Sequence, residues 1–229
     1  MSISIRSTRQ SGPGASGSGM ARAESSIRVV IALTPGFDAS SSTLLTAVLA
    51  RCNRLTRRPI CEWIYLSATG GSVASAEGYN VETTPFKEAV ITRSDFVIVC
   101  DAESYQRGHR EPDLQSLLRR AARMGVEIGA IGAGTFSLAR AGLLDNRRCS
   151  LHWRHVDAFQ ESFGGIVLAN SVVSEHAGVH TCAGGASVVD LMLTMMKRQV
   201  GSRIVDQVAE DYLFPVADAA ISGVSRRMP

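Results

Sequence analysis

Residues 129–153 hold the side-chain types and the spacing that say most about possible chemistry in this chain. An apolar run ends at Gly132, a glycine-rich turn leads into a short predicted helix, and a second short strand ends at His152 and Trp153. Enzymes that expose a nucleophile on a sharp strand-to-helix turn use this order of elements. Gly132 stands where that nucleophile belongs, and glycine carries no reactive atom. The segment therefore predicts the frame of a catalytic elbow without its nucleophile, which favours binding over catalysis.

The elbow can still bind a ligand through its backbone. The first N–H groups of a helix lie at the positive end of the helix dipole, so they suit an anionic group such as a carboxylate. We expect these donors to come from Ala133, Gly134 and Thr135. Gly132 leaves room for a ligand group, and Trp153 offers an aromatic face to a cation.

Each of these residues also has a purely structural interpretation. Gly132 could serve only to allow a strained backbone angle. A tryptophan such as Trp153 is more often a core residue than a ligand contact. His152 could equally be a hydrogen-bonding structural residue.

The elements that must position the elbow alternate between strand and helix. Apolar, β-branched runs predict strands, and capping residues with helical periodicity predict helices. The expected strands cover 27–33, 60–67, 96–100, 126–131, 166–168, 172–173 and 179–182, with a small hairpin over 72–82. The expected helices cover 38–53, 112–124, 134–141, 154–162, 185–196 and 202–213. This alternation indicates an α/β fold with a mainly parallel sheet sandwiched by helices.

The loops at one end of this sheet should form the binding site. Ligands of parallel sheets bind beyond the carboxyl ends of the strands. The turns at 35–37, 101–104 and Gly132 all follow predicted strands, so we expect them to converge on one pocket. Phe37 and Ser104 are therefore further candidate ligand contacts.

Length and composition indicate one domain. The chain has 229 residues, 45% of them apolar, which suffices for one full core. Residues 1–26 are rich in Ser, Gly and Arg and predict a flexible leader or a cloning remnant. Residues 27–214 form the expected domain, and residues 215–229 a tail or the start of a linker. No apolar stretch is long enough to cross a bilayer, so we expect no membrane partner.

The charge pattern does not predict a nucleic-acid surface. The net charge is only +3, and basic residues are scattered among acidic ones. Arg119, Arg120 and Arg123 share one predicted helix, which indicates an exposed helix face rather than a binding patch.

Cysteine and histidine spacing predicts neither a metal site nor a disulfide framework. The five cysteines form no CxxC pair, and the absence of a secretory signal predicts free thiols in a reducing cytoplasm. Cys100 and Cys182 are typical of small core-filling residues. His176 and His180 flank Gly178 in a stretch that indicates strand and turn, so we expect no zinc site. We therefore expect no cofactor and no metal ion.

Residues 134–153 read Gly-Thr-Phe-Ser-Leu-Ala-Arg-Ala-Gly-Leu-Leu-Asp-Asn-Arg-Arg-Cys-Ser-Leu-His-Trp. This segment resembles a signature of the class I glutamine amidotransferase-like superfamily, which includes the PfpI-type intracellular proteases. Within that superfamily it is most similar to the amino-terminal sensor domain of AraC-type transcription regulators of the GlxA kind. Residues 181–191 and 33–37 carry two further matches. The resemblance covers residues 27–214 and implies a flavodoxin-like, class I glutamine amidotransferase-like fold.

The chain departs from the enzymes of this superfamily at two positions. They carry a cysteine where this chain has Gly132 and a glutamate near where Ala47 falls, whereas His152 matches their elbow-side histidine. Without the thiol, a histidine alone has no nucleophile to activate. The resemblance therefore implies a cytoplasmic pseudoenzyme, the non-catalytic ligand-sensing domain of an AraC-family transcription regulator.

The resemblance also implies partners. The effector would be a small carboxylate or amine metabolite bound near the Gly132 elbow. The chain would form a homodimer and contact DNA only through a carboxy-terminal domain outside residues 1–229.

Two alternatives stay open from the sequence. One is a PfpI-like hydrolase or isonitrile hydratase-like enzyme with a relocated nucleophile, Cys182 or Cys100. The other is an inert partner domain in which the region around Gly132 is packed solid.

Overall fold

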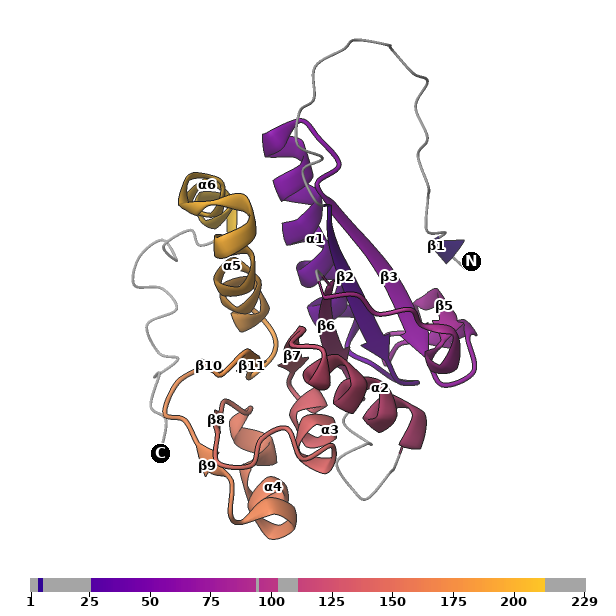
Figure 1. Cartoon of the computed structure of the whole chain (residues 1–229), viewed down its shortest axis with the longest axis vertical. Helices are drawn as coiled ribbons and strands as arrows, with labels where there is room; N and C mark the ends of the chain where they lie inside the picture. Colours follow the sequence, from indigo (N-terminus) through magenta and orange to yellow (C-terminus); the bar gives the residue numbers. More distant parts are fainter. Residues whose placement is uncertain (1–3, 6–25, 94, 103–110, 213–229) are drawn as a thin grey trace.

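The computed structural model describes residues 4–5, 26–93, 95–102 and 111–212. Within them, a sheet runs in the order β1-β5-β3-β2-β6-β7-β11-β10, with β4 also paired to β5 (Figure 1). The strands of this sheet are β1 (Ser4–Ile5), β2 (Ile27–Leu33), β3 (Cys61–Ser67), β4 (Gly71–Ala74), β5 (Asn80–Pro85), β6 (Asp95–Cys100), β7 (Glu127–Ile131), β10 (Val173–His176) and β11 (Val179–Cys182). A separate pair consists of β8 (Arg148–Cys149) and β9 (Val167–Leu168).

The centre of the sheet is parallel, as the sequence predicts. Strand β2 pairs in parallel with β3 and β6, and β7 pairs in parallel with β6 and β11. Only β10 and β4 pair antiparallel to their neighbours among the described strands. Strand β6 is buried along its whole length because helices cover both faces of the sheet.

Helices cover the sheet on both faces, which confirms the predicted layer order (Figure 1). They are α1 (Ala39–Thr56), α2 (Pro112–Arg123), α3 (Gly134–Arg140), α4 (Val156–Phe163), α5 (Ser187–Val200) and α6 (Ser202–Tyr212), with short 3-10 turns η1 (Phe86–Glu88) and η3 (Trp153–His155). One core cluster packs α1, α5 and α6 against the sheet, and a second packs α2, α3 and α4. Alternate residues of β2 divide between them: Val29 and Ile31 join the first, and Val30 joins the second.

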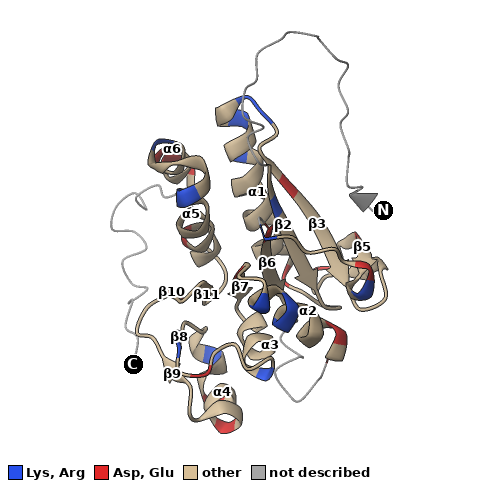
Figure 2. Cartoon of the chain, viewed as in Figure 1, with Lys and Arg blue, Asp and Glu red and all other residues tan. Residues whose placement is uncertain are grey.

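Helix α2 follows the sequence prediction closely. Pro112 opens it, and its apolar face of Leu114, Leu117, Leu118 and Ala121 is buried. Arg119 and Arg120 are exposed, as predicted. They also tie elements together, because Arg119 donates to the carbonyl of Ala141 at 3.2 Å and Arg120 to that of Ala89 at 2.8 Å. Figure 2 shows basic residues on several elements rather than gathered on one.

Element boundaries after the elbow differ from the prediction. The second strand, β8, ends at Cys149 and not at His152, which lies in a loop. The following segment forms a 3-10 turn first, and α4 begins only at Val156. Local periodicity over residues 150–156 does not distinguish the two helix types. Among the described helices, none combines the length and the apolar content that a bilayer crossing needs.

Candidate ligand-binding site

A cavity of about 530 Å³ lies beyond the carboxyl ends of β2, β6, β7 and β11. This volume suits a small organic ligand. Its lining residues come mostly from the loops after these strands: Gly36, Asp38, Ser41, Ala76, Glu77, Cys100, Asp101, Ala102, Ile131, Gly132, Ala133, His152, Arg154, His155, Ala183, Gly184 and Gly185. The predicted convergence of the three turns on one pocket is therefore confirmed, and the alternative of a solidly packed elbow is wrong.

Gly132 has a backbone that suits glycine and also borders the cavity. Its φ of +54° lies in the left-handed region, which most residues avoid. Its N–H donates to the carbonyl of Cys182 at 2.9 Å, and its own carbonyl accepts from the Thr135 N–H at 3.2 Å. A Cβ added to Gly132 would meet no atom nearer than the Ala183 carbonyl oxygen at 3.6 Å. A side chain at this position would therefore begin at ordinary van der Waals distance from its surroundings, without a clash.

The residues after Gly132 divide between cavity and core. Ala133 lines the cavity. Gly134 and Thr135 are buried and absent from the lining. Because the Thr135 N–H already donates to Gly132, the expectation that it stays available to a ligand is wrong. A Cβ on Gly134 would lie 2.6 Å from the Val99 carbonyl oxygen, so Gly134 allows α3 to pack closely on β6.

Acidic side chains border the cavity from the β2–α1 loop and the β4–β5 hairpin. Asp38 caps α1, and its carboxylate accepts hydrogen bonds from the N–H and hydroxyl groups of both Ser40 and Ser41. Burial alone would raise the pKa of Asp38, but these hydrogen bonds lower it below its ordinary value. Glu77 accepts from the Ala39 N–H at 3.0 Å, which ties the hairpin to the start of the same helix.

Asp101 is the most perturbed carboxyl group of the cavity. It is 5% exposed, and one of its oxygens accepts from the Ser137 hydroxyl. The other oxygen, Oδ1, has no hydrogen-bond partner among the described residues. Burial raises the pKa of Asp101 to about 7, although the hydrogen bond from Ser137 and the charge of Arg140 act in the opposite direction. Near neutral pH this carboxyl is therefore close to half-protonated.

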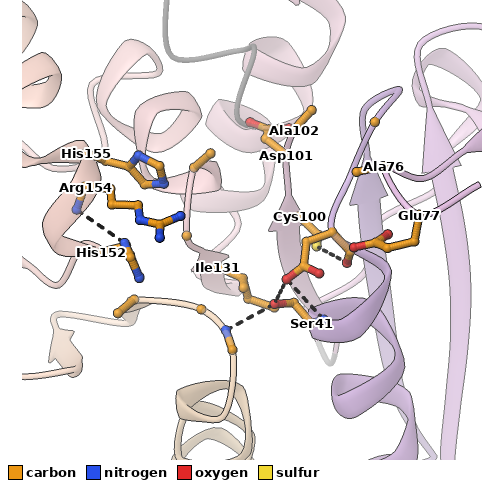
Figure 3. Close-up of a pocket in the computed structure, with 17 residues that line it drawn as sticks. Ser41, Ala76, Glu77, Cys100, Asp101, Ala102, Ile131, His152, Arg154 and His155 are labelled. Carbon is orange, nitrogen blue, oxygen red and sulfur yellow. Dashed lines mark hydrogen bonds between the residues drawn. The ribbon is translucent and has the colours of Figure 1, made fainter. Parts of the chain in front are cut away.

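Basic and imidazole side chains border the cavity from the opposite side (Figure 3). His152 directly precedes η3, and His155 is the last residue of η3. The centroids of the two imidazole rings are 5.5 Å apart. The backbone N–H of Arg154 donates to Nδ1 of His152 at 3.3 Å. The exposed Arg154 side chain points between the two imidazoles and pairs with no carboxylate among the described residues.

The structure revises the placement of the aromatic candidates. Trp153 is 63% exposed and absent from the cavity lining, so the expectation of a core residue is wrong. The guanidinium of Arg154 lies over its ring at 5.3 Å, so its aromatic face is already in contact with a cation. Phe37 is 1% exposed and belongs to the core, where it does not line the cavity. Ser104 lies outside the described residues.

Sequence reasoning missed several lining residues. Arg154 directly follows His152 and Trp153, and Glu77 lies at the hairpin tip, but neither belongs to a motif. Asp38 stands at the start of the helix predicted over 38–53, where its residue type indicates a helix cap and not a ligand contact. Within α1, Ser41 lines the cavity and Ala47 does not.

The cavity offers no activated thiol. Cys100 lines it, and its thiol donates weakly to the Asp38 carbonyl at 3.8 Å. Burial raises the pKa of Cys100 well above its ordinary value and that of Cys182 to about 11. Both thiols are therefore protonated near neutral pH, which disfavours them as nucleophiles. All five cysteines are free and buried.

No metal cluster accompanies the cavity in the part of the chain that the structure describes. No three His, Cys, Asp or Glu side chains lie close enough there to hold an ion. His180 is fully buried, and its Nε2 lies 2.9 Å from Glu127 Oε2. His176 is exposed at the end of β10, so the two histidines occupy different environments.

The parallel sheet, its two helical layers and the ligand-sized cavity at the carboxyl edge of the sheet together define a class of α/β domain. The chain belongs to the DJ-1/PfpI family, whose profile matches residues 27–198. The resemblance inferred from residues 134–153 is thereby confirmed.

Among curated relatives, transcription regulators are similar to this chain. It is 32% identical over 186 residues to the HTH-type transcriptional regulator GlxA of Rhizobium meliloti. This match covers 81% of this chain and 57% of the relative. It is 33% identical over 181 residues to the HTH-type transcriptional regulator CdhR of Pseudomonas aeruginosa. This match covers 79% of this chain and 53% of the relative. The chain thus spans about half the length of the curated relatives it matches.

Solved structures show the same fold. An AraC family transcriptional regulator from Pseudomonas putida superposes with a TM-score of 0.70 at 26% identity, covering 81% of this chain and 98% of that one. Drosophila melanogaster DJ-1beta superposes with a TM-score of 0.69 at 18% identity, covering 82% and 98%, which shows the fold alone.

Proposed function

We propose that this chain is the ligand-sensing domain of a transcription regulator and that it binds a small molecule without transforming it. The similarity to GlxA and CdhR, whose names describe HTH-type regulators, supports this role. Because the match covers only about half of each relative, DNA contact would belong to a further domain of the whole regulator. A homodimer acting in the cytoplasm is part of the same proposal.

One observation carries the choice of ligand: opposite charges face each other across the cavity. Glu77 borders it from one side, and Arg154 with the two imidazoles borders it from the other (Figure 3). Asp38 and Asp101 also line the cavity. A ligand with an ammonium group at one end and a carboxylate at the other complements both sides. We therefore propose a zwitterionic metabolite, with its carboxylate toward Arg154.

The absence of a side chain at Gly132 leaves cavity volume that the ligand can occupy. Gly132 lines the cavity with no side chain of its own, and Ala133 adds only a methyl group. The alternative, an enzyme with a relocated nucleophile, would need a thiolate at Cys100 or Cys182. Burial raises the pKa of both thiols, so this arrangement argues against that alternative.

A thermal-shift screen tests the proposal. The probes are amino acids and quaternary-ammonium carboxylates, each paired with an amide that lacks the carboxylate and an alcohol that lacks the amine. A zwitterion at 100 times its dissociation constant should stabilise the domain by about 2.7 kcal/mol, and its truncated partners should stabilise it less. Equal shifts for the zwitterion and both truncated probes would refute the two-ended site, and flat curves throughout would refute ligand sensing.

Replacing Arg154 by glutamine should weaken zwitterion binding about tenfold or more. The substitution removes a charge-assisted hydrogen bond, which contributes about 1.5–3 kcal/mol in such settings. Folding should change little because the Arg154 side chain is exposed. Calorimetric titration measures the effect, with Arg123→Gln as the matched control, since Arg123 is exposed on α2 and does not line the cavity. Equal affinities of the two variants would show that Arg154 does not contact the ligand.

A further inference from the structure

Two buried thiols lie side by side away from the ligand cavity. Cys52 is near the carboxyl end of α1, Cys61 is the first residue of β3, and both belong to the core cluster that packs α1 on the sheet. The side chains of Cys52 and Cys61 lie close enough that each thiol shifts the pKa of the other. Neither residue lines the cavity at the elbow.

Asn53 holds the two cysteines in this arrangement. Its Nδ2 donates to the carbonyl of Cys61 at 2.8 Å, and its Oδ1 accepts from the N–H of Cys61 at 2.8 Å. This double hydrogen bond joins the residue next to Cys52 to the backbone of Cys61. The helix end and the strand start are thus fixed to each other at the position where the thiols meet.

We propose that Cys52 and Cys61 are a redox-sensitive dithiol that a peroxide oxidises to an intramolecular disulfide. The bond would close residues 53–60 into a ring and link α1 covalently to β3. Residues 57–59 of the connecting loop are exposed, so opening of this short loop would admit a small oxidant.

The two thiols differ in a way that assigns their roles. The neighbouring Cys61 thiol lowers the pKa of Cys52, although burial opposes this change. The Cys52 side chain, together with burial, raises the pKa of Cys61. Cys52 is therefore the thiol that ionises first and attacks, and Cys61 is the thiol that resolves.

The chemistry balances with hydrogen peroxide as the oxidant. The Cys52 thiolate attacks one peroxide oxygen, the O–O bond breaks, and the departing hydroxide takes a proton to become water. The sulfur of Cys61 then attacks the Cys52 sulfenic acid and forms the S–S bond. The sulfenic hydroxyl leaves with the Cys61 proton as a second water.

Peptide mass spectrometry of the wild-type chain tests the proposal. The folded protein is treated with hydrogen peroxide, its remaining thiols are blocked in denaturant, and it is digested without reduction. We expect one disulfide-linked peptide pair joining Cys52 to Cys61, with Cys100, Cys149 and Cys182 recovered as blocked thiols. Recovery of all five cysteines as thiols, or a disulfide between any other pair, would overturn the proposal.

Two variants separate the roles of the cysteines. In Cys61→Ser, the sulfenic acid on Cys52 has no resolving thiol, so a dione reagent should label Cys52. In Cys149→Ser, which removes a buried thiol from the other core cluster, the Cys52–Cys61 linkage should form as in the wild type. Absence of dione label on a folded Cys61→Ser protein would contradict the assigned order of attack. Circular dichroism establishes that each variant is folded.

Discussion

Replacing Gly134 by alanine should destabilise the domain by on the order of 3 kcal/mol. The new Cβ would lie 2.6 Å from the carbonyl oxygen of Val99 and 3.1 Å from its carbonyl carbon. Neither contact can relax easily, because β6 pairs with β2 and β7 on its two sides and is buried throughout. Helix α3 would have to move away from the sheet, and the elbow at Gly132 would move with it. Urea unfolding followed by circular dichroism measures the loss.

Gly165→Ala is the matched control for this substitution. A Cβ at Gly165 would meet nothing within 4 Å, and this glycine does not have a positive φ. The control should change stability by no more than about 0.5 kcal/mol. If the two variants unfold at the same urea concentration, the close approach of α3 to β6 does not limit stability.

Asp101→Asn should become progressively more stable relative to the wild type as pH rises from 4 to 8. Burial raises the pKa of Asp101 from 3.8 to about 7 in the folded chain. Between these values the folded state keeps a proton that the unfolded state has released, so rising pH lowers wild-type stability through this group. Asparagine cannot ionise and avoids the loss, which amounts to on the order of 4 kcal/mol. Urea unfolding of both proteins at several pH values gives the difference.

Asp38→Asn should show the opposite pH dependence. The pKa of Asp38 is lowered in the folded chain, so its carboxylate stabilises the fold above its unfolded pKa of 3.8. This stabilisation is lost as pH falls through the folded pKa. The Asp38→Asn variant should therefore have a lower free energy of unfolding than the wild type at neutral pH, and the two values should converge in acid.

The outcome that would contradict the Asp101 prediction is a stability difference between Asp101→Asn and the wild type that stays constant between pH 4 and 8. That result would mean that Asp101 ionises as an ordinary surface carboxyl.

The fold could be predicted because its signals are local. The buried runs of β2 and β6 contain β-branched residues, and α2 carries Pro112 at its start and a regular apolar face. The rule that ligands bind beyond the carboxyl ends of parallel strands predicts that Gly132 borders the binding site, and Gly132 does line the cavity. The left-handed φ of Gly132 agrees with the predicted sharp turn.

The side chains of the site could be predicted only in part, because their roles depend on tertiary contacts. Nothing in the local sequence says that Trp153 stays exposed under Arg154, or that Phe37 turns into the core. Asp101 lies in a loop that was expected to reach the pocket, but its raised pKa arises from burial by elements distant in sequence. Likewise, Cys52 and Cys61 show no motif, and only folding of α1 onto β3 brings their thiols together.

Calorimetry on a cavity-blocking variant tests the central claim most directly. Ala76 lines the cavity and is exposed, whereas Ala74 is exposed on the same hairpin but does not line it. The ligand is the zwitterion that raises the melting temperature most in the thermal-shift screen. It is titrated into the wild type, Ala76→Trp and Ala74→Trp, then recovered, and its molecular mass is measured by mass spectrometry. We predict binding to the wild type and to Ala74→Trp, at least tenfold weaker binding to Ala76→Trp, and an unchanged ligand mass. Equal binding to both tryptophan variants, or a ligand converted to product by the wild type alone, would contradict a cavity that binds but does not react.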